Sequence, residues 1–213
     1  MAQQTYQLVC IIIPELLMLQ TREHIVQKNY EAIRKYGFQG LRTDKVIAEL
    51  GITKGAFYHY FPDKMAIGYA VVDEIIAPRQ IEIWENQLAQ NGHAIDKIVQ
   101  VLQSLISCTC QGEVLLGCPL NNLSQEMSYL DEGFRIRFET IVNKQIALIT
   151  SCLLQDIETL QIEKTEVESL AKFIISSIEG SYSLSKILKN KQVFDGNIKQ
   201  LQKQLLILKK QTI

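Results

Sequence analysis

Residues 43–64 read TDKVIAELGITKGAFYHYFPDK. They contain two short stretches with the apolar spacing of helices, joined by only two residues. Gly51 can end the first helix, and Thr53 can cap the second. Two helices joined by so short a turn must cross steeply, so this segment predicts a helix-turn-helix. The side chains expected to hold the pair together are Val46, Ile47, Leu50 and Phe57.

The rest of the chain repeats apolar residues every three to four positions, without a useful length of strand-like alternation. Only four prolines and eleven glycines occur in 213 residues, which favours helices over an all-β fold. We therefore expect an all-α fold, in which Pro78 bends or interrupts one helix and residues 111–117 form a loop. The expected helices cover residues 21–36, 43–50, 54–60, 64–90, 94–110, 119–127, 131–160, 165–190 and 197–209.

Details of the first helices are also predicted. Thr43 and Asp63 are expected to cap the helices that follow them. Gly37 is expected to stop the first helix. The inward face of that helix is expected to carry Ile25, Val26, Asn29, Ile33 and Tyr36.

Basic side chains are concentrated in one part of the chain. The net charge of the whole chain is −1, but residues 34–64 carry a net +3, which leaves −4 for the remainder. A basic module on a mildly acidic body suits a partner that meets one end of the protein.

The cysteines are odd in number and include no C-x-x-C pair, and the histidines are too scattered for a metal triad. No signal peptide is recognisable, so we expect free thiols and a cytoplasmic location. We expect no metal, no cofactor and no membrane span. The residues concerned are Cys10, Cys108, Cys110, Cys118, Cys152, His24, His59 and His93.

The second helix of a helix-turn-helix enters the DNA major groove with its N-terminal end first. Gly55 and Ala56 are small enough to let the backbone approach the groove, and Lys54 can donate to guanine. Ala56 or Tyr58 can contact a thymine methyl group, and hydroxyl or ammonium groups nearby suit phosphates. A plain helical hairpin with a solvated basic face is the alternative. The candidate DNA-binding residues are Thr43, Thr53, Lys54, Gly55, Ala56, Tyr58, His59, Tyr60 and Lys64.

The stretch from Leu41 to Lys64 resembles the DNA-binding signature of the tetracycline-repressor (TetR) family of bacterial transcriptional regulators. The resemblance rests on Thr43, Ile47, Ala48, Gly51, Thr53, Lys54, Gly55, Phe57, Tyr58, Tyr60, Phe61 and Lys64. It implies base contacts by Lys54, Gly55, Ala56 and Tyr58, and phosphate contacts by Thr43, Tyr60 and Lys64. Some members of the family carry a basic residue at the position of Asp44. Here we expect the Asp44 carboxylate to interact favourably with the helix dipole instead of with DNA.

The resemblance also implies a domain order. Residues 21–66 would form the three-helix DNA-binding domain, and residues 67–213 a helical domain that binds a ligand and dimerises. Residues 1–20 would be an extension that is disordered, a packing arm, or the product of a start codon upstream of the natural one. We expect residues 1–17 to be dispensable for DNA binding.

Two distal stretches, residues 117–126 (GCPLNNLSQE) and 131–138 (DEGFRIRF), resemble the C-terminal domain of one branch of this family. In that branch a glycine-cysteine pair opens a short helix over the ligand cavity, and some members use the cysteine to sense electrophiles or oxidants. A helix N-terminus would lower the pKa of the Cys118 thiol, whereas a small buried side chain in a pocket wall is the plainer reading. The candidate ligand-binding residues are Trp84, Cys118, Asn121, Asn122, Phe138, Phe173 and Ser177, with core packing as the alternative for each aromatic.

The resemblance implies that the last two long helices pair with their two-fold copies. A symmetric dimer requires a near-palindromic site on double-stranded DNA. The expected function is therefore a dimeric repressor, not an enzyme, that a small-molecule effector releases from its operator. The alternatives are a helical small-molecule or electrophile-binding protein that uses Cys118, and an enzyme with Cys118 as nucleophile, for which no local base is evident.

Overall fold

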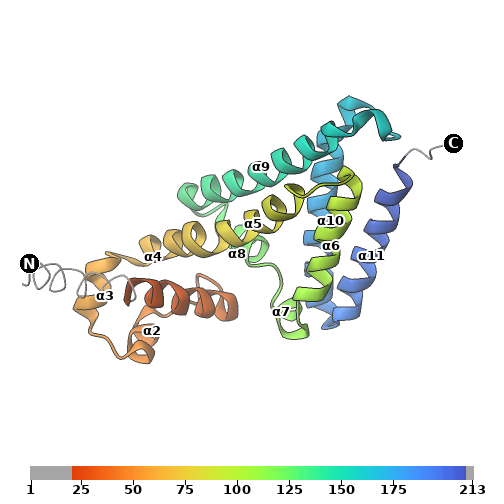
Figure 1. Cartoon of the computed structure of the whole chain (residues 1–213). Helices are drawn as coiled ribbons and strands as arrows, with labels where there is room; N and C mark the ends of the chain where they lie inside the picture. The colour runs from red at the N-terminus through yellow and green to blue at the C-terminus, as the bar shows by residue number, and fades with distance from the viewer. Residues whose placement is uncertain (1–20, 210–213) are drawn as a thin grey trace, which may run out of the picture. The chain divides into compact units, whose positions relative to one another are not determined.

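The computed structural model describes residues 21–209, apart from the side chain of Gln111. The predictions made for residues 1–20, including the dispensability of residues 1–17, therefore lie outside the described residues. By its internal contacts the chain divides into two compact units, the first ending at Ile75 and the second beginning at Ile76. This division falls after the fourth helix rather than at residues 66–67. The described part of the chain contains helices and one isolated β-bridge, between Leu160 and Lys209, and no strand (Figure 1).

The first unit contains the predicted short helices. Residues 21–36 are helical, and α2 (Thr43–Leu50), α3 (Lys54–Tyr60) and α4 (Lys64–Val71) follow. Gly37 and Gly51 take left-handed backbone angles, with φ of 75° and 65°, so each ends its helix at little steric cost. The core of this unit contains Ile25, Val26, Ile33, Phe38, Leu41, Val46, Ile47, Phe57, Phe61 and Ile67.

Three details of the first unit differ from the predictions. Tyr36 is 60% exposed, because the helix ends with it and its ring turns to the surface. Leu50 is only partly buried at the end of α2. Thr43 is the first residue of α2 rather than its cap, since Arg42 holds the cap position without a side-chain hydrogen bond.

The chain remains helical from Lys64 to Leu88, but with an irregular turn. A π-helical turn, Val72–Ile76, separates α4 from α5 (Ala77–Leu88). Pro78 lies in the first turn of α5 and has no N–H to donate to the preceding turn. The interruption that Pro78 predicted is thus present, and it takes the form of a π-turn.

The second unit is a set of long packed helices, in which α5 packs against α9, and α11 packs against α10 and α6 (Figure 1). Its core includes Trp84, Ile98, Leu102, Ile149, Leu153, Ile174 and Phe194. The helices are α6 (Ala94–Cys108), α7 (Gln111–Leu116), α8 (Pro119–Met127), α9 (Glu132–Gln155), α10 (Val167–Leu188) and α11 (Lys191–Ile207), with 3-10 turns at Ile157–Thr159 and Lys164–Glu166.

Two predictions for the second unit were wrong. The expected loop at residues 111–117 contains α7, which Gly117 ends with a φ of 80°. The last helix begins at Lys191 rather than at residue 197, because Asn190 caps it by accepting a hydrogen bond from the Gln192 backbone N–H at 2.9 Å. Phe194 then anchors the added turn, since it is fully buried and its ring centroid lies 4.5 Å from that of Tyr182.

No single helix within residues 21–209 combines the length and hydropathy needed to cross a membrane. One bent pair, α6 with residues 112–127, passes that test by length and composition.

Candidate functional site

Two contacts fix the helix α3, one at its start and one at its middle. At its start the Thr53 hydroxyl accepts a hydrogen bond from the Ala56 backbone N–H at 3.1 Å. At its middle Phe57 is fully buried, with its ring centroid 6.2 Å from that of Phe61. Because Phe57 faces the core, the side chains on the opposite face of α3 point outward.

The outward face of α3 carries most of the predicted base-contacting residues. Lys54, Gly55, Tyr58 and His59 are exposed, and Tyr58 is held edge-on to Phe57 at 5.4 Å between ring centroids. A Cβ atom added at Gly55 would meet nothing nearer than the Thr53 hydroxyl at 3.9 Å. Packing within the protein therefore does not require glycine here, which leaves close approach by a partner as a reason for it.

The remaining predicted contacts surround this helix. Ala56, Tyr60 and Thr43 are half-buried. Lys64, the first residue of α4, donates to the Gln39 carbonyl at 3.1 Å and lies 5.0 Å from the centroid of the Phe38 ring. Its ammonium is therefore positioned by the loop after the first helix rather than left to move in solvent.

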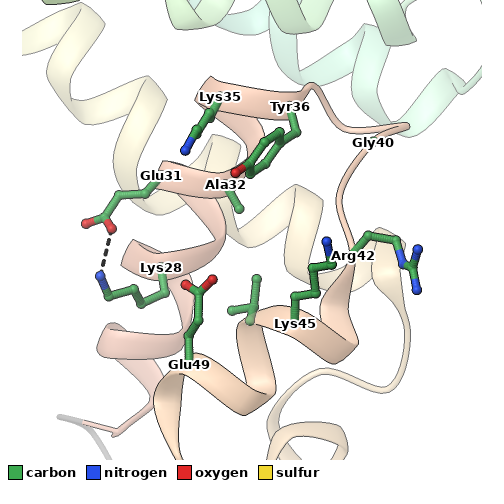
Figure 2. Close-up of a pocket in the computed structure, with 10 residues that line it drawn as sticks. Lys28, Glu31, Ala32, Lys35, Tyr36, Gly40, Arg42, Lys45 and Glu49 are labelled. Carbon is green, nitrogen blue, oxygen red and sulfur yellow. Dashed lines mark hydrogen bonds and ion pairs between the residues drawn. The ribbon is translucent and has the colours of Figure 1, made fainter.

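A charged groove of about 380 Å³ lies between the first helix and α2 (Figure 2). Lys35 contacts the Tyr36 ring on one wall, at 5.1 Å from the ring centroid. Basic side chains outnumber acidic ones, which makes the groove attractive to phosphate. Its lining residues are Lys28, Glu31, Ala32, Lys35, Tyr36, Gly40, Arg42, Lys45, Val46 and Glu49.

Two of these cations, Arg42 and Lys45, lie beside Thr43 but were not among the predicted DNA contacts. The signal that could have identified them is the local basic excess. Asp44 pairs with Arg42 at 3.1 Å, and this guanidinium lowers the pKa of the Asp44 carboxyl group. Asp44 thus orients a neighbouring cation in addition to sitting in the first turn of α2.

A second cavity, of about 80 Å³, lies inside the second unit among α5, α6, α9 and α10. Trp84, a predicted ligand-binding residue, is 3% exposed and lines it. The Gln145 amide donates to the backbone carbonyl and the side-chain oxygen of Gln80, at 3.1 and 3.2 Å. Its lining residues are Arg79, Gln80, Ile83, Trp84, Leu105, Gln145, Ile175, Ile178, Glu179 and Tyr182.

Cys118 adjoins this cavity through two of the lining residues. The Gln80 amide donates to its sulfur at 3.7 Å, and Glu179 interacts with its thiol. Burial raises the pKa of the thiol well above its ordinary range, and the negative charge of Glu179 adds to this effect. The helix N-terminus at α8 lowers the pKa, as predicted, but burial outweighs it.

The other predicted pocket residues lie elsewhere in the second unit. Asn121 donates to the Ser183 hydroxyl at 3.1 Å, and Asn122 donates to the Leu116 carbonyl at 2.6 Å. Phe138 is buried against Phe134, with 5.6 Å between ring centroids. Phe173 and Ser177 line a separate surface groove between α10 and α11, where Phe173 is 54% exposed.

The structure therefore places Trp84 in the cavity wall and Cys118 behind it, in contact with the lining residue Gln80, and leaves out the other predicted residues. It adds polar residues that sequence reasoning missed, above all Glu179. The available signal was a lone carboxylate within the apolar and serine-rich run IISSIEGSYSL of α10. Gln80 and Gln145 carry no comparable signal, because glutamine is common on exposed helix faces.

Within residues 21–209, no group of three or more His, Cys, Asp or Glu side chains has an arrangement that could hold a metal ion. Cys108 and Cys110 are exposed free thiols, and Cys118 and Cys152 are buried ones.

Both halves of the chain match family models. Residues 25–70 match the model of the bacterial regulatory proteins of the tetR family. Residues 94–201, about half of the chain, match the model of the tetracyclin repressor-like C-terminal domain. The first match covers the helix-turn-helix, and the second covers most of the cavity wall.

Individual proteins are similar over most of the chain. An HTH-type transcriptional regulator in the lacX 3' region of Lactococcus lactis subsp. lactis is 29% identical over 180 residues, 83% of this chain and 89% of the relative. The HTH-type transcriptional repressor DhaR of Mycobacterium sp. (strain GP1) is 26% identical over 175 residues, 82% of this chain and 86% of DhaR.

A solved structure shares the fold. The crystal structure of the reduced form of Escherichia coli NemR superposes with a TM-score of 0.75 at 24% identity, covering 85% of this chain and 95% of that one. With a helix-turn-helix whose second helix exposes its polar face, a separate helical unit with an internal cavity, and two matching family models, the chain belongs to the TetR family of DNA-binding transcriptional regulators, which are not enzymes.

Proposed function

We propose that this regulator is a dimeric repressor that binds a near-palindromic operator and is released from it by a small molecule. The observation that carries the proposal is the exposed polar face of α3, held outward by the buried Phe57. Lys54, Gly55, Ala56 and Tyr58 would contact bases. The phosphate contacts would come from Thr43, Tyr60 and Lys64, with Arg42 and Lys45 added, while Thr53 and His59 would flank the base contacts.

Repression is proposed by similarity. DhaR and NemR are both transcriptional repressors by name, and DhaR is similar over most of this chain. Since the partner is chromosomal DNA, the proposal includes a cytoplasmic location.

The proposed dimer would use α10 and α11. Half of the large apolar side chains that are exposed in the described chain lie on these two helices: Phe173, Leu184, Ile187, Leu188, Leu206 and Ile207. An open groove of about 350 Å³ between the two helices includes Phe173 and Leu184. Exposed apolar patches of this kind mark association surfaces, and a second copy of the same helices would cover them symmetrically.

The proposed effector would bind in the cavity around Trp84. The cavity wall on α5 belongs to the same continuous helical segment that starts at Lys64. A ligand that binds one arrangement of α5 better than another would bias that segment, and so the affinity for DNA.

The test is a gel-shift titration with DNA from upstream of the protein's own gene, followed by footprinting. We expect saturable, salt-dependent binding to a near-palindromic segment, weakened in Lys54→Ala. Equal affinity for an unrelated duplex of the same length would refute specific operator binding. A footprint without two-fold symmetry would refute the palindromic site.

A further inference from the structure

The cavity of the second unit contains a carboxyl group with an unmet hydrogen-bonding capacity. The Oε2 atom of Glu179 is inaccessible to solvent, and within residues 21–209 it accepts no hydrogen bond. A buried oxygen without a donor costs free energy, and folded proteins rarely leave one in that state. Among the side chains of residues 21–209, none therefore supplies a hydrogen bond to this oxygen.

The Cys118 thiol forms a hydrogen bond with the Glu179 carboxyl group, and three other neighbouring donors are committed to other acceptors. The Gln145 amide donates to Gln80, and the Gln80 amide donates to the Cys118 sulfur. The Tyr182 hydroxyl lies 3.5 Å from the Thr109 hydroxyl. Arg79 and Trp84 also line the cavity wall; Arg79 is exposed and has interactions of its own, and Trp84 carries one indole N–H.

The rest of the wall favours a cation over a neutral donor. Trp84 and Tyr182 present aromatic rings, whose faces attract ammonium groups. Ile83, Ile175 and Ile178 provide an apolar surface for a short hydrocarbon chain. Burial raises the pKa of Glu179 to about 7, so a bound cation would draw the carboxyl group into its ionised form near neutral pH.

The size of the cavity limits the ligand. Its volume is about 80 Å³, about half that of an apolar cavity known to hold benzene. A ligand of only a few non-hydrogen atoms would fit between the helices as they stand, and only the Glu179 carboxyl group would have to turn to present Oε2 to it.

We propose that this cavity binds a small organic ammonium ion, whose N–H group donates to Oε2 of Glu179 while its hydrocarbon chain lies against Trp84 and the isoleucines. The inference rests on the proposed function, because it names the chemical class of the effector. It differs from the cysteine-based sensing considered above, since no bond to Cys118 forms.

The test uses Trp84, the sole tryptophan of the chain, as a fluorescent reporter. The full chain is titrated at pH 8 with n-propylammonium, and with 1-propanol and propionate as neutral and anionic probes of similar size. We expect propylammonium to bind at least about tenfold more tightly than 1-propanol, and propionate not to bind. Equal binding of propylammonium and 1-propanol would overturn the inference.

Variants of α10 assign the effect to one carboxyl group. Glu179→Gln should weaken propylammonium binding at least about tenfold and leave 1-propanol unchanged. Glu168→Gln is the matched control, because Glu168 is an exposed acid of the same helix, paired with Lys172 at 2.6 Å, and it should change neither. Glu179→Asp, which keeps the charge, should weaken propylammonium binding less than Glu179→Gln does. It replaces Glu179→Gln as the test variant if that protein does not fold. Full propylammonium affinity in both Glu179 variants would also overturn the inference.

A gel-shift titration in the same preparation tests the proposed function separately. Saturating propylammonium should lower the affinity for the operator. If propylammonium binds through Glu179 but operator affinity does not change, the ammonium site stands and ligand-released repression fails. If operator binding is intact and propylammonium is not preferred, the DNA-binding role stands and the ammonium site fails.

Discussion

At the scale of single residues, burial decides the chemistry of α10. It raises the pKa of Glu179 from an ordinary value of 4.5 to about 7, and that of Tyr182 to about 12. Both shifts arise because the charged form loses water when the side chain enters the unit. Glu179 is therefore the group whose ionisation reaches the neutral pH range.

Glu179 should make stability depend on pH. Between about pH 4.5 and 7 the folded chain holds a proton on this group that the unfolded chain has lost, so the free energy of unfolding falls as pH rises. The loss from this group should approach roughly 3 kcal/mol at pH 8. Urea unfolding at pH 5 and pH 8 measures it, with Glu179→Gln for comparison.

The Cys118 and Tyr182 side chains near Glu179 do not ionise in this window, because burial raises the pKa of both groups. The pH dependence should therefore be shallower in Glu179→Gln. The same slope in both proteins would show that Glu179 is not the group responsible.

Tyr58 and Lys54 are the residues whose removal should affect DNA binding most directly. Both are exposed on α3, so truncation to alanine removes a contact to DNA without opening a cavity in the core. Each change should weaken operator binding by about 1–3 kcal/mol, as measured by gel shift. Lys172→Ala, an exposed lysine of α10, is the control and should have no effect. Wild-type affinity in both α3 variants would exclude this helix as the reading element.

Residue positions could be predicted where a helix face decides them. Phe57 was predicted to be inward because it falls at the apolar position of a short helix, and it is fully buried. Tyr36 met the same spacing rule and is exposed, because the rule does not say where the last turn ends. The cavity residues come from α5, α6, α9 and α10, so no local pattern could have gathered them.

At the scale of elements, caps set the boundaries of the short helices. The Thr53 hydroxyl bonds the Ala56 backbone N–H at 3.1 Å, and the Asp63 carboxylate bonds that of Ala66 at 2.7 Å. Each satisfies a donor that the helix itself cannot. Both caps were predicted, because Thr and Asp stand directly before helical residues.

The cap of α3 should contribute measurable stability. Thr53→Ala removes the acceptor and should lower the free energy of unfolding by about 1 kcal/mol. Thr53→Ser keeps the hydroxyl and should lie closer to the wild type. Urea unfolding of the wild type and both variants measures the free energy of unfolding. Equal losses of this free energy in the Ala and Ser variants would mean that the hydroxyl does not stabilise the helix.

Elements with weaker signals were harder to predict. The start of α11 depends on Asn190 as a cap and on Phe194 as an anchor in the core. Asp195 and Gly196, directly after Phe194, obscure the apolar repeat. The helix α7 has only six residues and begins after Cys110, which makes no side-chain cap. Tertiary packing rather than local propensity decides such elements.

At the scale of the whole molecule, the proposed function depends on two copies of the chain. A second copy would cover the apolar side chains exposed along α10 and α11, and a palindromic operator would require two recognition helices. The all-α class could be read from periodicity. The proposed dimer surface could not be read from periodicity, because apolar residues on a buried face and on a dimer face have the same spacing. The family resemblance alone implied that the last two long helices pair with their copies.

The wild-type chain should be a dimer at micromolar concentration. Phe173→Lys places a charge in the groove between α10 and α11 and should raise the dissociation constant of the dimer at least about tenfold. Tyr129→Lys is the control, because Tyr129 is 97% exposed outside these helices and should not alter the mass. Sedimentation velocity of the wild type and both variants measures the dissociation constant of the dimer. A monomeric wild type would contradict the proposed dimer.

The most direct test of dimeric operator binding is the stoichiometry of the DNA complex, measured by sedimentation of the full chain with a labelled duplex carrying the footprinted operator. We expect two chains, or a multiple of two, on each duplex, and at least about tenfold weaker binding when one half-site is scrambled. One chain bound on each duplex, with the same affinity for the intact and the half-scrambled site, would contradict it.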